Sequence, residues 1–232
     1  MILVSGSGRL AKELEELSND SLPIRILSRR EMDITDEHRV SEVIKTYMMK
    51  PDYPKYFIHT AALTKPMEVN DRNPLMSMDT NIVGTANVAR ICDKYGIKFI
   101  YISTDFVYGD SNLVDEESEV KPSNNYGWSK LGGECVTRLI PNSLILRCSL
   151  CDIPFRHNVA FDDVYRNSIT HNDVANIILK VKDEIGVINV GGEYQSVYDF
   201  VSKHQDVKKG SGSDIAPSLH LLTGKLMSIV NE

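Results

Sequence analysis

The sequence predicts an α/β protein built on a doubly wound parallel sheet, with a smaller C-terminal lobe. Short apolar runs of strand length alternate with stretches in which apolar residues recur every three or four positions, as on one face of a helix. Two glycines directly follow the first apolar run, where a strand would turn into a helix. The 232 residues, 42% hydrophobic and 25% charged, are enough for one generous core and too few for two full domains.

The first part of the chain alternates strand and helix in order. Met1 to Ser5 is a strand-sized apolar run, after which Leu10, Leu14 and Leu17 recur at helical spacing. Further strands are expected at 24–27, 56–58, 97–103 and 143–146, separated by helices around 40–47, from Pro74 to Gly96 and over 126–139. Because strands that alternate with helices are joined by crossovers, these strands form a parallel sheet.

The C-terminal part is less regular. We expect a helix over 173–181, a strand over 186–190 and a short helix from about Val197. The stretches 109–125 and 151–169 are expected to form loops. Residues 208–213 have the composition of a flexible connector, and 219–230 have the composition of a final helix.

Charge and composition narrow the partners. The net charge of −6 argues against a nucleic-acid groove or an anionic membrane surface and favours a small-molecule ligand. No apolar run is long enough to span a bilayer, and residues 1–20 lack a signal-peptide pattern, so a cytoplasmic protein is expected. The four cysteines are too few for a disulfide scaffold. Cys148 and Cys151 form either a metal or redox pair or, as we favour, two thiols at a strand end.

The segment 6–11 has the pattern G-x-G-x-x-A between the first strand and the first helix, the context of a dinucleotide-binding fingerprint. Gly6 permits a tight turn and Gly8 lets the backbone approach a pyrophosphate, while Ala11 lets the helix pack on the sheet. A plain glycine-rich turn is the alternative. This pattern predicts a Rossmann-type cofactor site that includes Gly6, Ser7, Gly8, Arg9 and Leu10.

The second strand ends in Ser28, Arg29 and Arg30, where an NAD site usually carries an acidic residue against the adenosine ribose. Arginine offers paired donors to a 2′-phosphate, which a carboxylate would repel, so NADP(H) is the favoured cofactor. Both arginines could equally be solvated surface charges. Asp33 and Ile34 are expected to flank the adenine.

Tyr126 and Lys130 lie one helical turn apart on the same face. A charged Lys130 would lower the pKa of the Tyr126 phenol, which could then donate a proton to a carbonyl while a hydride arrives from nicotinamide. The pair follows Ser103, Thr104 and Asp105 at the carboxyl end of the fourth strand, the edge where open α/β sheets bind ligands. The Thr104 hydroxyl, or less favourably that of Ser103, could hold the carbonyl. Strand capping is the alternative for both hydroxyls.

With these residues, the chain resembles the extended short-chain dehydrogenase/reductases, and within them the dTDP-4-dehydrorhamnose reductases. The resemblance covers about residues 1–150 and rests on the segments 32–36, 59–64, 81–85, 102–108, 126–130 and 145–147. It implies that Thr104, Tyr126 and Lys130 are catalytic and that Thr104 and Asp105 contact the substrate. It also implies that Ala61, Ala62 and Leu63 lie along the cofactor, together with Tyr126 and Lys130.

The function that this resemblance implies is an NADPH-dependent reductase of a nucleotide-linked 4-keto-6-deoxy sugar, with hydride from nicotinamide and a proton from Tyr126. Dehydratase relatives carry an Asp-Glu pair after the catalytic threonine. Here Phe106 follows Asp105, which disfavours a dehydratase. The alternatives are an NAD-retaining nucleotide-sugar epimerase and a non-catalytic NADP-binding regulatory subunit.

The resemblance also implies how the chain is organised. Residues 1–150 form the cofactor-binding domain with the catalytic residues, and 151–232 form a reduced substrate-side lobe, partly interleaved with the sheet. The glycine turn is one residue shorter than the family pattern G-x-x-G-x-x-G, and the segment between Arg147 and Asp173 is shortened. A homodimer through the helices near 75–95 and 126–139 is expected, and no metal is required.

Overall fold

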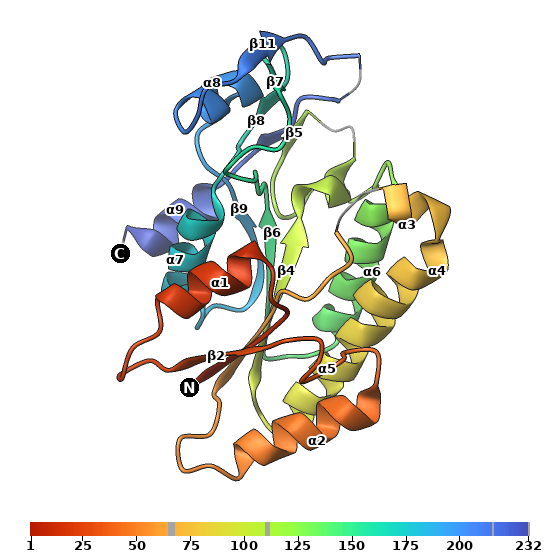
Figure 1. Ribbon diagram of the computed structural model, residues 1–232, viewed down its shortest axis with the longest axis vertical. Coiled ribbons are helices and arrows are strands. Elements are labelled where there is room, and N and C mark those ends of the chain that lie inside the picture. The colour runs from red at the N-terminus through yellow and green to blue at the C-terminus, as the bar shows by residue number, and fades with distance from the viewer. Residues whose placement is uncertain (65–67, 110–111, 215, 232) are drawn as a thin grey trace.

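The computed structural model describes residues 1–64, 68–109, 112–214 and 216–231. Its centre is a six-stranded sheet in the order β2-β1-β3-β4-β6-β9, with every neighbouring pair parallel (Figure 1). The strands are β1 (Ile2–Ser5), β2 (Ile24–Leu27), β3 (Tyr56–His59), β4 (Lys98–Thr104), β6 (Ser143–Cys148) and β9 (Gly186–Val190). The prediction of a Rossmann-type parallel sheet is confirmed.

Helices cover both faces of this sheet (Figure 1). One face carries α1 (Arg9–Glu16), α7 (His171–Val181) and α9 (Gly224–Val230), and the other carries α2 (Glu37–Met48), α5 (Gly84–Lys94) and α6 (Asn125–Arg138). Side chains alternate along β1: Ile2 and Val4 join the core under α1, whereas Leu3 joins the core under α2. Because both faces are buried, the strand appears in the sequence as an unbroken apolar run.

The order of the strands reverses between β1 and β3. The chain leaves β1 for β2 at one edge, then crosses to β3 on the other side of β1 and continues outward to β9. In an open parallel sheet such a reversal opens a crevice at the carboxyl ends of the two strands. The loops that follow β1 and β3 therefore face each other across that crevice.

The helix predicted from Pro74 to Gly96 contains a π-helical interruption. It consists of α4 (Pro74–Ser77), the π-turn η1 (Met78–Val83) and α5, and is preceded by α3 (Glu68–Arg72). Gly96 ends it as predicted, with φ +66°, and the Ile97 N–H donates to the Cys92 carbonyl at 2.9 Å. Periodicity of apolar residues does not reveal the wider turn, because the buried positions of this stretch, Ser77 and Asn81, are polar.

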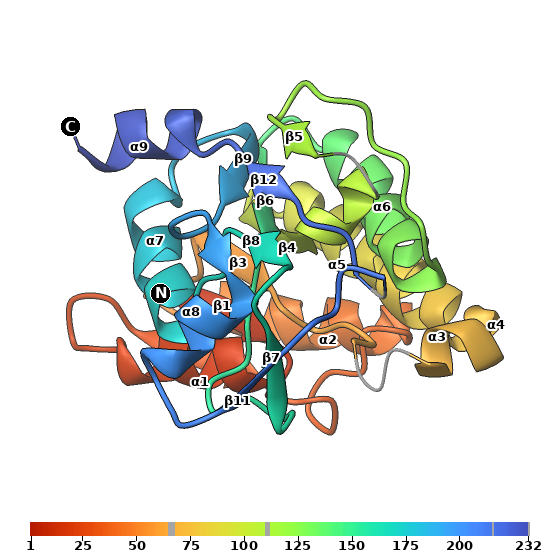
Figure 2. The ribbon, with the colours of Figure 1, turned by 90° about the horizontal axis from the view of Figure 1, so that it is seen from above.

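Short strands build a lobe beyond the carboxyl edge of the sheet (Figures 1 and 2). The pairs are β7 (Val159–Phe161) with β11 (Lys208–Gly210), β8 (Tyr165–Arg166) with β10 (Gln195–Ser196), and β5 (Leu113–Val114) with β12 (His220–Leu221). The helix α8 (Val197–Ser202) packs beside β7. In the part of the chain that the structure describes, no helix is long and apolar enough to cross a bilayer.

Several expectations for this lobe are wrong. The predicted loops hold β5, β7 and β8; residues 110 and 111 of the 109–125 stretch lie outside the described residues. Residues 208–213 are no flexible connector, because β11 pairs with β7 and the Asp163 carboxylate accepts bonds from the Gly212 and Ser213 N–H groups. The final helix begins only at Gly224, since His220 and Leu221 pair with β5.

Candidate active site

The turn after β1 uses its two glycines for different reasons. Gly6 has φ +95°, and a Cβ there would lie 3.1 Å from the backbone of Ala61 on the loop after β3. Gly8 has an ordinary extended backbone and caps α1, and a Cβ built on it would meet nothing within 4 Å. Gly6 is therefore needed for the turn itself, whereas Gly8 leaves open space beside the N-terminus of α1.

A cleft of about 320 Å³ opens at this turn. It brings together most of the residues predicted to bind a cofactor. They are Gly6, Ser7, Gly8, Arg29, Asp33, Ile34, Ala61, Ala62 and Leu63, joined by Met32, Thr35, Thr60, Thr64, Met76 and Thr80. The cleft thus runs over the carboxyl ends of β1, β2 and β3, where the strand order reverses.

The residues after β2 do not all face this cleft. Arg29 lies at its rim with 82% of its side chain exposed, and its Nε donates to Asp33 at 3.1 Å. Arg30 is exposed and does not line the cleft, and the Ser28 hydroxyl donates to Glu31 at 2.7 Å. Of the two predicted arginines, Arg29 is therefore the one that lines the cleft.

Arg9 and Leu10 point away from this part of the cleft. The Leu10 side chain is buried in the core under α1, so that only its backbone is available to a ligand. The Arg9 guanidinium donates to the carbonyl of Ile153 at 3.2 Å and lies 3.5 Å from the Asp152 carboxylate. Arg9 thus ties the glycine turn to the segment that follows β6.

A second, smaller cleft of about 140 Å³ continues toward the predicted catalytic residues. Gly8, Thr60, Ala62 and Thr64 line both clefts, so the two are continuous. The rest of its lining comes from Arg9, Leu10, Ile102, Ser103, Tyr126, Lys130, Leu150 and His171. One elongated groove therefore leads from Arg29 at one end to Tyr126 at the other.

Thr104 and Tyr126 meet at the end of β4. Thr104 caps the short helix η2 (Asp105–Tyr108), where its hydroxyl oxygen accepts from the Phe106 N–H at 3.3 Å. The Phe106 ring then makes an edge contact with the Tyr126 ring, with centroids 6.0 Å apart. The Thr104 hydroxyl thus caps the helix that follows β4, rather than the strand as the alternative role supposed.

The pKa of Tyr126 moves in the direction opposite to our prediction. Burial and the nearby Asp105 carboxylate raise the pKa of the Tyr126 phenol, and a hydrogen bond with the Thr104 side chain only partly offsets them. The spacing of Tyr126 and Lys130 alone had predicted that a charged Lys130 would lower this pKa. Desolvation is the largest cause of the shift, and Lys130 is not among the groups that move the pKa of Tyr126.

Lys130 is itself buried, with 3% of the residue exposed. Its Nζ lies 4.1 Å from the centroid of the Tyr101 ring, on the adjacent strand β4. Burial lowers the pKa of Lys130 to about 7, although Glu134 and Cys148 act to raise it. Near neutral pH the side chain is therefore close to the midpoint between ammonium and amine.

Two buried residues that the sequence reasoning assigned no role hold the walls of the groove. Asn81 in the π-turn accepts from the Leu63 N–H at 2.7 Å and donates to the Ser129 hydroxyl at 2.8 Å. His59 bonds the Ser5 hydroxyl at 2.8 Å, and burial lowers the pKa of its imidazole to about 3, so it stays neutral. The sequence signal that could have identified Asn81 is its position as a polar residue within the apolar stripe of the predicted helix.

Asp105, predicted to contact substrate, is 4% exposed and already bonded. One of its oxygens lies 3.2 Å from the Thr104 hydroxyl, and the other accepts from the Ser149 hydroxyl at 2.7 Å and from Arg166 at 3.2 Å. The Arg166 guanidinium comes from β8 and lies 5.3 Å from the centroid of the Phe106 ring. Asp105 thus anchors a cation of the lobe near the Tyr126 end of the groove.

Neither the cysteines nor the acidic residues build a metal centre among the described residues. Cys148 is buried at the end of β6, where burial and Asp105 raise the pKa of its thiol, and Cys151 is partly buried beyond it. Neither is joined in a disulfide. This geometry matches our interpretation of the C-x-x-C pair as thiols at a strand end.

The doubly wound sheet, the glycine turn and the groove at the reversal of strand order define a Rossmann-type dehydrogenase/reductase fold. More narrowly, the chain belongs to the RmlD substrate binding domain family, whose profile matches residues 1–152. The match covers the lining of the groove except His171, and it includes Thr104, Tyr126 and Lys130. The resemblance to this group of reductases is thereby confirmed.

Two curated relatives show how far the likeness extends. The probable low-salt glycan biosynthesis reductase Agl14 of Haloferax volcanii is 35% identical over 122 residues, which is 51% of this chain and 39% of the relative. The dTDP-4-dehydrorhamnose reductase of Mycolicibacterium smegmatis is 28% identical over 152 residues, which is 63% of this chain and 44% of the relative. The chain thus spans less than half the length of these relatives.

A solved structure extends the likeness of fold to the whole chain. The dTDP-4-dehydrorhamnose reductase of Bacillus anthracis, crystallised with NADP, superposes with a TM-score of 0.84 at 23% identity. The superposition covers 99% of this chain and 91% of that chain. The short strands of the lobe therefore have counterparts in that fold, even where sequence similarity ends.

Proposed function

We propose that this chain is an NADPH-dependent reductase of a nucleotide-linked 4-keto-6-deoxy sugar. The observation that carries the proposal is the continuous groove, with a glycine turn and Arg29 toward one end and Tyr126 and Lys130 at the other. Such a groove fits an extended dinucleotide whose reactive ring ends beside a proton donor. The relatives named as reductases of dTDP-linked sugars support the choice of substrate class.

The residues present fit a nicotinamide dinucleotide. Gly8 leaves open space where any side chain would project, and α1 begins there without a side-chain cap on its first N–H groups. Free N–H groups at a helix N-terminus suit a pyrophosphate. Ala61, Ala62 and Leu63 form the opposite wall, and the Asn81 amide holds the last of them through both backbone groups, at 2.7 and 3.2 Å.

The proposed preference for NADP(H) rests on Arg29. Its side chain stands at the rim of the groove, 82% exposed, and among the described residues its guanidinium pairs with Asp33 through Nε. A 2′-phosphate placed there would gain a charge-assisted fork of hydrogen bonds. Arg30 contributes at most a longer-range positive charge from outside the groove.

In the proposed reaction the bound cofactor supplies a hydride to the carbonyl carbon. Tyr126 donates its phenolic proton to the carbonyl oxygen, so the ketone becomes an alcohol and the phenol becomes a phenolate. The raised pKa of Tyr126 keeps the phenol protonated before the reaction, which suits a proton donor in the reductive direction. The phenolate is reprotonated from solvent after the product leaves.

Thr104 and Lys130 support this proton transfer from two sides. The Thr104 side chain hydrogen-bonds the phenol, so it can orient both the tyrosine and the incoming carbonyl. A protonated Lys130 stabilises the phenolate as it forms, because the two residues line the same small cleft. Asp105 contributes on the substrate side by holding Arg166 at this end of the groove.

The test is a screen of the purified protein for NADPH oxidation with several nucleotide-linked 4-keto-6-deoxy sugars. We expect oxidation with at least one dTDP-linked member and a slower rate with NADH than with NADPH. A known reductase assayed beside it shows that each substrate is competent. Absence of oxidation with every member, while the known reductase turns them over, would rule the proposal out.

The two alternatives give other results in the same preparation. An NAD-retaining epimerase would purify with tightly bound NAD and interconvert sugars without net oxidation of added NADPH. A non-catalytic regulatory subunit would bind NADPH and oxidise none of it.

We further propose that residues 151–232 form the substrate-side lobe.

The same proposal includes a homodimer through α4, α5 and α6. Leu75, Met76 and Met78 are 65%, 45% and 43% exposed, and Trp128 on the adjoining α6 is 52% exposed. These elements lie side by side in both ribbon views (Figures 1 and 2). Apolar side chains gathered in this way suit a self-complementary interface.

A further inference from the structure

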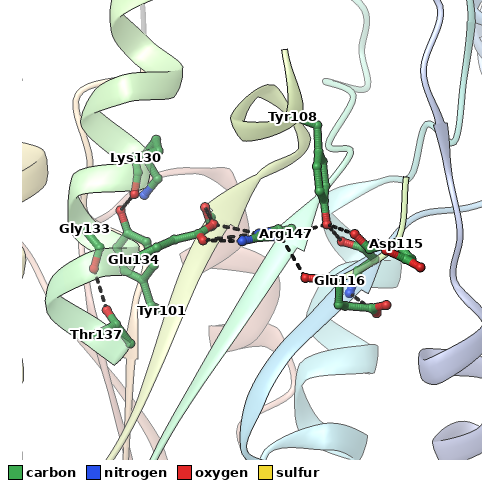
Figure 3. Close-up of polar contacts among 11 residues, drawn as sticks. Tyr101, Tyr108, Asp115, Glu116, Lys130, Gly133, Glu134, Thr137 and Arg147 are labelled. Carbon is green, nitrogen blue, oxygen red and sulfur yellow. Dashed lines mark hydrogen bonds and ion pairs between the residues drawn. The ribbon is translucent and has the colours of Figure 1, made fainter. Parts of the chain in front are cut away.

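A fully buried ion pair lies directly behind the proposed catalytic residues. Glu134 on α6 is 0% exposed and Arg147 on β6 is 1% exposed, and the guanidinium meets both carboxylate oxygens at 2.8 to 3.2 Å (Figure 3). The Ser103 hydroxyl donates to the same carboxylate at 2.6 Å. The pair thus joins the catalytic helix to the ends of β4 and β6.

The network continues from Arg147 toward the lobe. Arg147 Nη1 donates to the Tyr108 hydroxyl at 2.9 Å (Figure 3). That hydroxyl in turn donates to Oδ1 of Asn189 on β9 at 2.7 Å. The Asn189 side chain in turn donates to the Leu222 carbonyl at 3.2 Å. A change at Glu134 would therefore be felt by α6, β4, β6 and β9 together.

Lys130 lies one turn before Glu134 on the same face of α6, and Figure 3 shows both side chains beside the Tyr101 ring. The Tyr101 hydroxyl donates to the Lys130 carbonyl at 3.2 Å, fixing this turn of the helix. The groups that face the Lys130 ammonium are His59 from β3, Tyr101 from β4, Cys148 from β6 and Glu134 from its own helix. Among them Glu134, ion-paired with Arg147, is the carboxylate, whereas burial raises the pKa of the Cys148 thiol.

A buried ion pair is a poor way to stabilise a fold, because desolvation consumes most of the Coulombic gain and apolar replacements of equal volume often do as well. The contacts of this pair favour another role. Its carboxylate accepts from Ser103 and lies one helical turn after a lysine whose protonation is opposed by burial.

We propose that the Glu134–Arg147 pair is a positioning device of the active site, which holds the Lys130 turn against β4 and favours the ammonium form of Lys130 over the amine. Glu134 supplies the negative charge and Arg147 fixes its direction through the guanidinium fork. The importance of the ammonium for turnover rests on the proposed reductase function. The effect of the pair on the protonation of Lys130 does not depend on that function.

The test measures the titration of Lys130 in protein labelled with [ε-¹³C]lysine, with its signal assigned from a Lys130→Met sample. We expect a midpoint near 7 in the parent and a midpoint lower by about one pH unit or more in Glu134→Gln, a change of about tenfold in the ratio of ammonium to amine. Glu117→Gln, at an exposed glutamate, is the matched control and leaves the midpoint unchanged.

Glu134→Gln leaves Arg147 without its charged partner and can weaken the fold, so a second variant is needed. The pair Glu134→Leu with Arg147→Met removes both charges while keeping apolar volume. We expect it to melt close to the parent but to keep the lowered Lys130 midpoint. If the pair had only a structural role, the folded double variant would keep the parental midpoint of Lys130, and that result would overturn the proposal.

Turnover supplies the second readout. In both variants the alkaline limb of the kcat profile should move to lower pH by the same amount as the Lys130 midpoint, while the Kd for NADPH changes less than about threefold. An unmoved alkaline limb beside a shifted midpoint would refute the link to catalysis. Should the protein reduce no keto sugar at all, the NMR titration still decides whether the pair controls Lys130.

Discussion

Replacing Lys130 with methionine should make the protein more stable and inactive. The pKa of Lys130 falls from 10.5 to about 7 on burial, which corresponds to a penalty of about 4 to 5 kcal/mol on the charged form in the folded state. Methionine fills similar volume without that penalty but loses the contact of the ammonium with the Tyr101 ring, worth about 1 to 2 kcal/mol. We therefore expect a net gain of about 3 kcal/mol at pH 6 or below.

The pH dependence gives this prediction its sign. The folded-state pKa of Lys130 is lowered, so below about pH 7 the folded parent carries the full penalty. As the pH rises toward the unfolded-state pKa, both states become neutral and the penalty disappears. The advantage of Lys130→Met should thus shrink to under about 1 kcal/mol near pH 10.

Urea unfolding of the parent and of Lys130→Met at about pH 6 and about pH 10 measures both quantities. The variant Lys12→Met, at an exposed lysine of α1, is the control and should show the same small difference at both pH values. A Lys130→Met protein that is no more stable than the parent at pH 6 would refute the reasoning. So would an advantage that does not change with pH.

Three further predictions concern the groove and the proposed interface. Arg29→Ala should weaken NADPH binding by about tenfold or more and leave NADH binding nearly unchanged, as measured by fluorescence titration, whereas equal losses would refute the 2′-phosphate role. Gly8→Val should melt like the parent yet lose cofactor affinity, because the new side chain enters the groove. Gly6→Ala should instead cost about 1 to 3 kcal/mol of stability, because Gly6 has φ +95° and a Cβ there would lie 3.1 Å from Ala61. Calorimetry measures the loss of stability and titration with cofactor measures the loss of affinity. Trp128→Glu should convert a dimer into a monomer in light scattering, and a parent that is monomeric at all concentrations removes the interface proposal.

The sheet and its covering helices could be predicted because their signals are local. Strands buried on both faces appear as unbroken apolar runs, as in 97–103, and Gly96 marks the end of α5 through its left-handed backbone. The lobe could not be predicted in this way. Strands of two or three residues such as β11 exist only because a partner such as β7, far away in the sequence, supplies their hydrogen bonds.

The position of the candidate site followed from sequence order, since parallel strands place their carboxyl ends at one edge. The electrostatics of the site did not follow from the sequence. The spacing of Tyr126 and Lys130 indicated a lowered tyrosine pKa, but burial raises it and lowers that of Lys130 instead. The Glu134–Arg147 pair was equally hidden, because nothing in the sequence shows that two charges so typical of surfaces are enclosed.

The most direct test of the proposed function is single-turnover hydride transfer from bound NADPH to a dTDP-linked 4-keto-6-deoxy sugar, in the parent and in Tyr126→Phe. Phenylalanine keeps the ring that contacts Phe106 and removes only the proton donor. We predict that the variant binds NADPH as the parent does and transfers hydride about 10² to 10⁴ times more slowly. Equal rates in the two proteins would contradict the role given to Tyr126, and no transfer in either would contradict the proposal that this chain is a reductase of such sugars.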